Sequence, residues 1–328
     1  MINVKEKSLF SKNVITSKKY EMEEKTKDTT IPFYSNTMFD AMFNNTSRIK
    51  YPAYFISLLF NLDKEEVLNN IELVKNKINI DNINDSKKTV DFVCKLDDEY
   101  INIEVNNYNS IGALERNLSY MFDIYKSNMK SGDKEYNYER VYQVNLNNFE
   151  FEGHETFIEE YNIRDKEGNL LTDKINVINI YLPKLKNVCY NKDINELERL
   201  LLLLVETKIE KSKEIAKGNI VMEEYVKEAL DASSNEEIVG LYDKELHEER
   251  LKNTLIREER ERAREEGINE GIKQGIEKGY SSGKEDGILE EKKIVARNML
   301  NKNMEISIIS EITGLLKEEI ENIKNNLN

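Results

Sequence analysis

Cysteine, histidine and long apolar runs are all scarce in this sequence. The two cysteines, Cys94 and Cys189, lie far apart without CxxC spacing, so neither a disulfide framework nor a zinc finger is expected. The only two histidines, His154 and His247, argue against a histidine-based hydrolase or a histidine-rich metal centre. The longest aliphatic run, 200–205, is far shorter than the about 20 residues of a membrane-spanning helix. We therefore expect a cytoplasmic protein that neither enters a membrane nor carries a secretion signal.

Basic residues are outnumbered by acidic ones, 48 to 62. The net charge of −14 and the pI of about 5.0 mean that the chain as a whole repels phosphate. Contact with a nucleic acid therefore needs a local basic surface or a bound cation. Hydrophobic residues make up 39% and charged residues 34%, which still allows a buried core. No P-loop, dinucleotide fingerprint or Ser-His-Asp set is present.

Composition and periodicity divide the 328 residues into more than one folded part. Helical spacing over 36–62, interrupted near Pro52, predicts two helices that precede the first strands, which indicates an α/β or α+β fold. The five expected parts are a loosely ordered leader (1–30), a compact α/β domain (31–190), a helical extension (191–243), a long charged helix (244–298) and a short helical C-terminal module with a glycine turn (299–328).

Two alternating stretches at the start of the α/β domain predict a β-hairpin. Apolar and polar residues alternate over 90–94 and again over 101–105, on either side of the turn residues Asp97 and Asp98. A helix is expected over about 111–129, and further strands over 141–146 and 175–182, which are rich in β-branched and aromatic residues.

The hairpin places two acidic residues opposite each other. If Asp97 and Asp98 form its tip, Asp91 lies directly across from Glu104, and Asn106 shares their face of the sheet. Like charges at such a pair are destabilising unless a cation lies between them. Two alternatives remain: the acids sit on a solvated face, or the register differs by one residue and they never meet.

The long charged helix contains a tetrapeptide repeat with glycine at every fourth position, from Gly267 to Gly287. Each glycine inside a helix costs about 1 kcal/mol relative to alanine. Close approach of a second helix along the glycine stripe would offset this loss. Because a four-residue step overshoots a helical turn by about 40°, a leucine-zipper seam is disfavoured. We expect homo-oligomerisation or docking through this tail.

The segments 88–91 (KTVD) and 101–106 (INIEVN) resemble the D…E-x-Q/K core of the PD-(D/E)XK nuclease superfamily. The chain is similar in particular to the Rpn family of recombination-promoting nucleases or putative transposases. The similarity extends to the opening helix around 39–43, the glycine repeat, and the C-terminal segments 296–300 and 312–320. It covers most of the chain, so it is far more specific than a D…E-x-K match alone.

The resemblance implies a restriction-endonuclease-like α/β core, in which a mixed central sheet is flanked by helices, followed by an all-helical C-terminal region with a long helix. It implies a Mg²⁺-dependent (or Mn²⁺-dependent) DNA endonuclease, associated with recombination or mobile elements, that hydrolyses phosphodiester bonds with metal-activated water. Asp91, Glu104 and the carbonyl oxygen of Val105 would hold the metal. The catalytic residues would be Asp91, Glu104 and Asn106.

Two further residues match the helix that follows the motif in this family. Arg116 and Tyr120 lie one helical turn apart, so both are candidates to bind the substrate phosphate, the arginine by its charge and the tyrosine by a hydrogen bond. The alternative is a surface arginine beside a core tyrosine.

The sequence departs from the family pattern at the position two residues after the glutamate and in the first helix. Asn106 stands where the superfamily often has lysine and this family commonly has glutamine, and it carries no charge with which to stabilise a transition state. Asn36 and Asp40 stand where the family tends to have an acidic residue and a lysine. The alternative function is therefore a catalytically degenerate member that acts as an oligomerising or DNA-associated binding protein.

Overall fold

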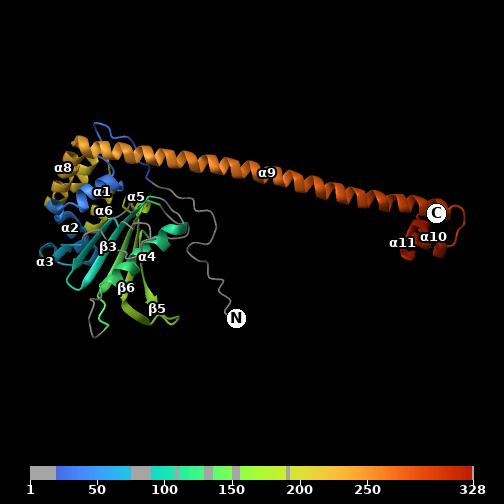
Figure 1. The fold of residues 1–328 in the computed structure, drawn as a ribbon, viewed down its shortest axis with the longest axis horizontal. Coiled ribbons are helices and arrows are strands. Elements are labelled where there is room, and N and C mark those ends of the chain that lie inside the picture. Colours follow the sequence, from blue (N-terminus) through green and yellow to red (C-terminus); the bar gives the residue numbers. More distant parts are fainter. Residues whose placement is uncertain are drawn as a thin grey trace. The chain divides into compact units, whose positions relative to one another are not determined.

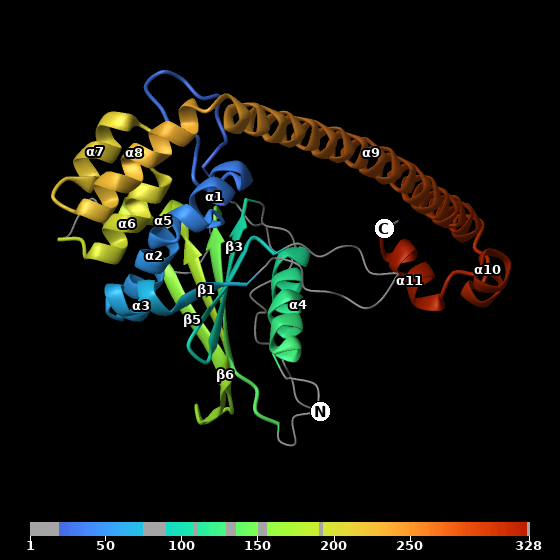
Figure 2. The same ribbon diagram turned by 60° about the vertical axis from the view of Figure 1, so that its left-hand side comes forward.

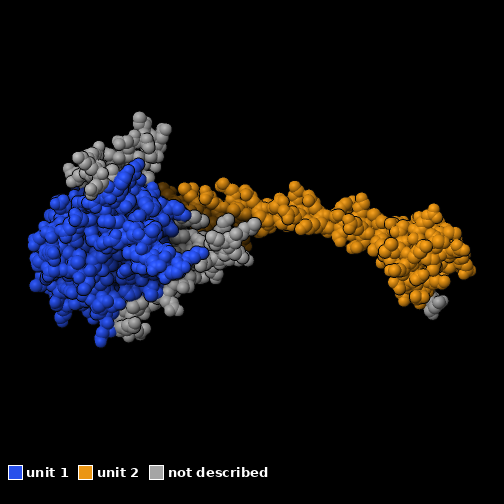
Figure 3. Space-filling view, turned by 90° about the horizontal axis from the view of Figure 1, so that it is seen from below, with its two compact units in different colours: residues 1–249 blue, residues 250–328 orange. Residues whose placement is uncertain are grey.

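The computed structural model describes residues 20–74, 90–107, 111–128, 136–149, 156–189 and 193–326. The chain forms two compact units, residues 1–249 and 250–328, coloured separately in Figure 3. The expected α/β domain and the expected helical extension both belong to the first unit.

A six-stranded mixed sheet, in the order β1-β2-β3-β4-β6-β5, forms the centre of the first unit. Strands β3, β4 and β6 run parallel to one another, and the remaining neighbours are antiparallel. The mixed sheet expected from the sequence is thus confirmed. Its strands are β1 (Ile71–Leu73), β2 (Phe92–Leu96), β3 (Glu99–Asn106), β4 (Arg140–Asn147), β5 (Ile158–Arg164) and β6 (Leu170–Tyr181).

Helices cover both faces of this sheet (Figures 1 and 2). The helix α4 lies on one face, and a larger group that includes α1, α2, α6 and α8 belongs to the core on the other. The helices of the first unit are α1 (Asn36–Phe43), α2 (Lys50–Phe60), α3 (Lys64–Asn70), α4 (Ile111–Ser127), α5 (Leu182–Cys189), α6 (Glu196–Val205), α7 (Ile209–Ala216) and α8 (Ile220–Ser234), with a short 3₁₀ helix at Thr46–Arg48.

The alternation of β-strand side chains separates two apolar clusters. Phe92 and Ile103 face the main core, whereas Val93 packs with Met121 and Val141 beneath α4. Leucines of α6 and Tyr225 of α8 join the main core, so these helices of the expected extension pack with the sheet. Burying one such large apolar side chain contributes about 1.5–3 kcal/mol to the free energy of folding. Because several such side chains lie on the same face of each strand, their burial determines which face points into the core.

The break between the first two helices does not lie at Pro52, as the sequence suggested. Pro52 instead occupies the first turn of α2, where its missing N–H has no intrahelical partner to lose. The interruption falls between Asn44 and Ile49, where Asn45 caps the short 3₁₀ helix.

Part of the expected leader is also ordered. Residues 1–19 lie outside the described residues, but Thr30 donates its N–H to the carbonyl of Thr207 at 2.9 Å, and Thr29 pairs with Lys208. Residues just before the first helix are thus tied to the helical part of the same unit by main-chain hydrogen bonds, which the polar composition of the leader did not indicate.

The long helix α9 (Glu236–Leu300) begins inside the first unit. Tyr242 is fully buried, and its hydroxyl donates to the carbonyl of Glu23 at 2.7 Å. The carboxylate of Glu245 accepts hydrogen bonds from the backbone N–H groups of Asn36 and Thr37, at 2.8 and 3.0 Å. It therefore caps the N-terminus of α1, where unpaired N–H groups and the helix dipole favour a negative charge.

The second unit contains the rest of α9 and two short helices, α10 (Ile306–Thr313) and α11 (Lys317–Asn325). Gly314 ends α10 with a φ of 68°, the left-handed conformation that favours glycine. A small apolar cluster of Ala296, Ile309, Leu315 and Ile320 holds the three helices of this module together.

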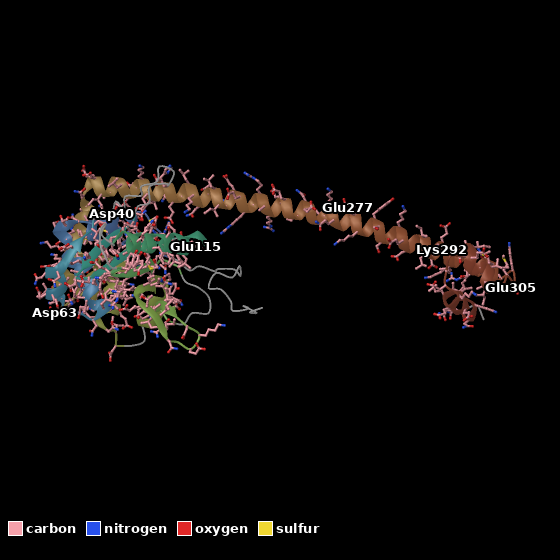
Figure 4. The ribbon with its side chains drawn as sticks, turned by 60° about the horizontal axis from the view of Figure 1, so that its bottom comes forward. Asp40, Asp63, Glu115, Glu277, Lys292 and Glu305 are labelled. Atoms are coloured by element: carbon pink, nitrogen blue, oxygen red, sulfur yellow. The ribbon has the colours of Figure 1, made fainter. Side chains whose placement is uncertain are left out.

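The middle of α9 is exposed throughout its glycine repeat. Its side chains, such as Glu277 in Figure 4, project away from the helix on all sides. A Cβ atom added at any glycine from Gly267 to Gly287 would meet nothing within 4 Å, so no described segment of the same chain packs on the stripe. Within the described residues, no helix combines the length and apolarity that crossing a membrane requires.

Replacing Glu245 by alanine should destabilise the first unit, because three donors at the start of α1, including the hydroxyl of Thr37 at 2.8 Å, lose their acceptor. The expected loss in the free energy of unfolding is about 1–2 kcal/mol, measured by urea denaturation of the full chain. Glu248→Ala is the matched control on the same helix, since it removes only an exposed pair with Lys244 at 4.0 Å. Equal losses for the two variants would contradict the capping role.

Candidate active site

The β2–β3 hairpin has the register that the sequence predicted. Phe92 pairs with Ile103 and Leu96 pairs with Glu99, which leaves Asp97 and Asp98 as the turn. Asp97 has a φ of 51°, a left-handed conformation that aspartate tolerates better than most residues. Asp91, directly before β2, therefore lies across from Glu104.

The two carboxylates are held together through the backbone. Asp91 Oδ2 accepts a hydrogen bond from the N–H of Val105 at 2.8 Å, and Glu104 Oε1 accepts one from the N–H of Asp91 at 3.1 Å. The side-chain amide of Asn102 donates to Glu104 Oε1 at 3.4 Å. Glu104 is only 2% exposed. The alternative of two acids on a solvated face is therefore wrong.

Burial raises the pKa of both carboxyl groups. For Asp91 the charge of Asp40 adds to this effect, while the hydrogen bond from Val105 opposes it. For Glu104 the nearby charge of Asp91 is the second cause. No described lysine or arginine lies within ion-pair distance of either carboxylate. A pair of this kind disfavours its own ionisation until a cation compensates it.

Helix α1 contributes to the site through Asn44 and Asp40. The side-chain amide of Asn44 donates to Asp40 Oδ1 at 2.7 Å and also to the carbonyl of Asp91. Asp40, labelled in Figure 4, lines a polar cleft of about 890 Å³ between α1 and the first turns of α9. Acidic residues outnumber basic ones along this cleft, so it does not favour phosphate. Asn36 lies at the start of α1, where its N–H binds Glu245.

Asn106 lies on the same face as Glu104, as predicted, and is buried under α4. Its Oδ1 accepts hydrogen bonds from Arg116 Nη2 at 3.0 Å and from Asn117 Nδ2 at 3.2 Å. Its Nδ2 donates to Asn147 Oδ1 at 3.0 Å. Asn106 is thus one member of a buried amide network that also includes Asn102, Gln143, Asn145 and Asn179.

The two proposed substrate residues lie in different surroundings. Arg116 is exposed on α4, and its guanidinium reaches Asn106 at the edge of the acidic pair. Tyr120 packs in the apolar cluster beneath α4 with Val90 and Val141. The structure thus brings Arg116 to the acidic pair, whereas the contact of Tyr120 with substrate stays a prediction.

The donor set suits a hard divalent cation. Val105 directs its N–H toward Asp91, and its carbonyl oxygen lies on the same edge of β3, past the point where pairing with β2 ends. The buried Oδ1 of Asn102, beside Glu104, has no hydrogen-bond partner in the part of the chain that the structure describes. Within the described residues, no three acidic, histidine or cysteine side chains form a metal cluster. Two carboxylates with a carbonyl oxygen still fit Mg²⁺, which keeps several waters and takes few protein ligands.

Sequence reasoning missed the amide network and the role of Asn44. A signal for the network exists in β4, where Gln143, Asn145 and Asn147 alternate with buried apolar residues. Polar side chains at every second position of a buried strand indicate a face that is both covered and hydrogen-bonded. Asn44 left no such signal, because its contact with Asp91 depends on how α1 packs.

A family model described as PD-(D/E)XK nuclease family transposase matches residues 38–259, which is more than half of the chain. The matched range includes most of α1, the whole sheet and α4, and so both acidic residues of the hairpin. No curated protein and no solved structure matches the chain significantly.

The raised pKa of Glu104 predicts an unusual pH dependence of stability. A carboxyl group whose folded pKa exceeds its unfolded value stabilises the fold below the ordinary carboxyl range, and this contribution is lost as pH rises through the folded pKa. In EDTA, Glu104→Gln should therefore raise the free energy of unfolding at pH 8 by on the order of 1–3 kcal/mol, and by much less at pH 4.

Urea denaturation at the two pH values measures this difference. The exposed Glu115 on α4, labelled in Figure 4, offers a matched control, since Glu115→Gln should leave the pH dependence as in the wild type. A Glu104→Gln variant that is less stable than the wild type at pH 8 would show that the pair is not electrostatically strained.

Proposed function

Because the chain belongs to the PD-(D/E)XK nuclease family transposases, we propose that it is a divalent-metal-dependent DNA endonuclease, linked to recombination or mobile elements, that hydrolyses phosphodiester bonds. The observation that carries this proposal is the pair of half-buried Asp91 and buried Glu104, which exchange hydrogen bonds through the hairpin backbone and form no ion pair with a described lysine or arginine.

Asp91, Glu104 and the carbonyl oxygen of Val105 would hold Mg²⁺ or Mn²⁺. The ion, when bound, lowers the pKa of a water molecule and stabilises negative charge on the phosphate. Glu104 must give up the proton that its raised pKa retains, so the affinity for the ion rises with pH. Two hydrogen bonds orient Asp91. The N–H of Val105 donates to its carboxylate, and the side-chain amide of Asn44 donates to its backbone carbonyl.

The reaction adds water across one phosphodiester bond. The water oxygen bonds to phosphorus, the bond to the leaving sugar oxygen breaks, and the proton lost by water is balanced by the one that the leaving oxygen gains. Arg116, which hydrogen-bonds to Asn106 beside the acidic pair, would contact the phosphate, which the net charge of −14 would otherwise repel. Asn106 was predicted to orient the attacking water, and that role stays a prediction.

A catalytically degenerate member that binds DNA or oligomerises without cutting is the second candidate. The observation in its favour is that Asn106 has no charge and its amide oxygen is already engaged by Arg116 and Asn117. Such a protein would keep the fold and the tail but lack efficient hydrolysis.

Cleavage of supercoiled plasmid with Mg²⁺ or Mn²⁺ separates these candidates. Asp91→Ala and Glu104→Ala should each slow nicking by at least about 100-fold, because each removes electrostatic support for the transition state. Glu115→Ala, which changes an exposed acid of α4, should cut at the wild-type rate. Activity that survives both substitutions rules out this site, and a wild type that never cuts favours the degenerate member.

We also propose that the tail forms homo-oligomers. The glycines from Gly267 to Gly287 are open to solvent in the single chain. The residues that directly follow these glycines in the sequence are also exposed and form a second row beside the stripe. Ile268, Ile272 and Ile276 in that row are 51%, 56% and 67% exposed. A second α9 packed on the stripe would bury these isoleucines and recover the helix propensity lost at the glycines.

Leucine at two stripe positions, Gly275→Leu and Gly279→Leu, should abolish self-association while making the helix itself more stable. A Cβ atom added at either position meets nothing within 4 Å beyond the backbone of its own helix, and each replacement favours the helix by about 1 kcal/mol. Light scattering should report a lower mass, and circular dichroism an unchanged or higher helicity. Gly240→Leu, also on α9 but outside the repeat and equally open, is the control. An unchanged mass for the double variant would contradict packing along the stripe.

A further inference from the structure

The guanidinium of Arg116 is held by the amide network beside the two acids. Nη2 donates to Asn106 Oδ1 at 3.0 Å, and Nε donates to Asn117 Oδ1 at 3.4 Å. We propose that Asn106 is a positioning residue that aims Arg116 at the scissile phosphate, instead of directing the attacking water itself. This inference rests on the proposed function of the site, and it assigns Asn106 a different role there.

The hydrogen bonds of Asn106 leave little capacity for a water molecule. Its oxygen accepts two hydrogen bonds and its nitrogen donates one, so a single N–H remains. The side chain is only 3% exposed. Asn117, which also holds Asn145 at 2.8 Å, fixes Asn106 from the side of α4. An acceptor held this rigidly is suited to fixing a donor, and its charged donor is Arg116.

Arg116 needs such an anchor because it is otherwise an exposed side chain. A free arginine loses about 2 kcal/mol of rotamer freedom when it is ordered, and prior anchoring lowers the part of this loss that falls on substrate binding. Its charge already acts on the site, since it lowers the pKa of both Asp91 and Glu104 against the effect of burial. Among the described residues, it is the only cationic side chain that hydrogen-bonds to the amide network.

The two roles of Asn106 predict different behaviour toward DNA. A residue that directs water affects hydrolysis and leaves DNA affinity unchanged. A residue that positions Arg116 affects affinity as well, and its effect disappears once Arg116 is gone, because the two substitutions then remove the same contact.

A double-mutant cycle on the full-length chain tests the proposal. Asn106→Ala, Arg116→Ala and the double variant are compared for binding of a fluorescent DNA duplex in Ca²⁺, with the DNA checked for integrity, and for cleavage in Mg²⁺. Arg116→Ala should weaken binding and reduce the salt slope by about 1, as expected for the loss of one phosphate contact. Asn106→Ala should weaken binding in the same direction, and the double variant should match Arg116→Ala.

One control variant and one substitute variant complete the double-mutant cycle. Arg164→Ala removes an exposed arginine of β5 and should leave the affinity near the wild-type value. If Asn106→Ala lowers the yield of folded protein, Asn106→Ser is used in its place, since the shorter hydroxyl fills less of the network but keeps a polar group there.

Wild-type affinity for Asn106→Ala, or effects that multiply in the double variant, would overturn the proposal, as would a wild type that does not bind DNA at all. A wild type that binds DNA but never cuts it would instead contradict the nuclease function. The coupling between Asn106 and Arg116 could then still be measured from DNA binding. Failure of the inference and failure of the proposed function are therefore distinguishable.

Discussion

The site depends on one arrangement that is unfavourable by itself, the placement of the buried carboxyl group of Glu104 beside the half-buried one of Asp91 at the end of a β-hairpin. Asp91 and Glu104 are fixed there by two hydrogen bonds across the hairpin. Asp91 accepts one from the backbone N–H of Val105, and Glu104 accepts one from the backbone N–H of Asp91. Those bonds are set by the β2–β3 register, and the register is set in turn by the apolar residues between them. A slip of one residue would expose the core face of β2 and separate the acids.

The surroundings of this pair divide into a cationic side and an acidic side. Under α4, a connected set of amide side chains joins β3, β4 and β6 and ends on Arg116. On the α1 side, Asn44 binds both Asp91 and Asp40, and Glu245 of α9 caps the same helix. A buried polar network is stabilising only when its members are satisfied, and both side-chain polar atoms of Asn106 take part in hydrogen bonds. The Oδ1 of Asn102, beside Glu104, is the exception, since it has no hydrogen-bond partner among the described residues.

Much of the fold and the acidic pair could be predicted from the sequence, because they follow from local patterns. Alternation with a turn at Asp97 and Asp98 was enough to set the hairpin register, and the inner strands and most of the helices, though not α3 and α5, followed from their periodicity. The edge strands β1 and β5 were missed, since β1 is very short and β5 has little buried surface to impose a pattern. Pro52 was misplaced because proline is compatible with a first helical turn as well as with a break.

The partners of the site residues could not be predicted, because they come from elements distant in sequence. Nothing local to Asn106 indicates that Arg116 and Asn147 bind it, nor does Glu245 reveal that it caps a helix two hundred residues earlier. Such contacts depend on tertiary packing, which spacing rules do not describe.

Calorimetric titration of the full-length chain with Mn²⁺ tests the central claim most directly, because it needs neither DNA nor turnover. We predict one ion per chain at pH 8, weaker binding at lower pH, and loss of that binding in both Asp91→Ala and Glu104→Ala. Binding of unchanged affinity in either variant would contradict it.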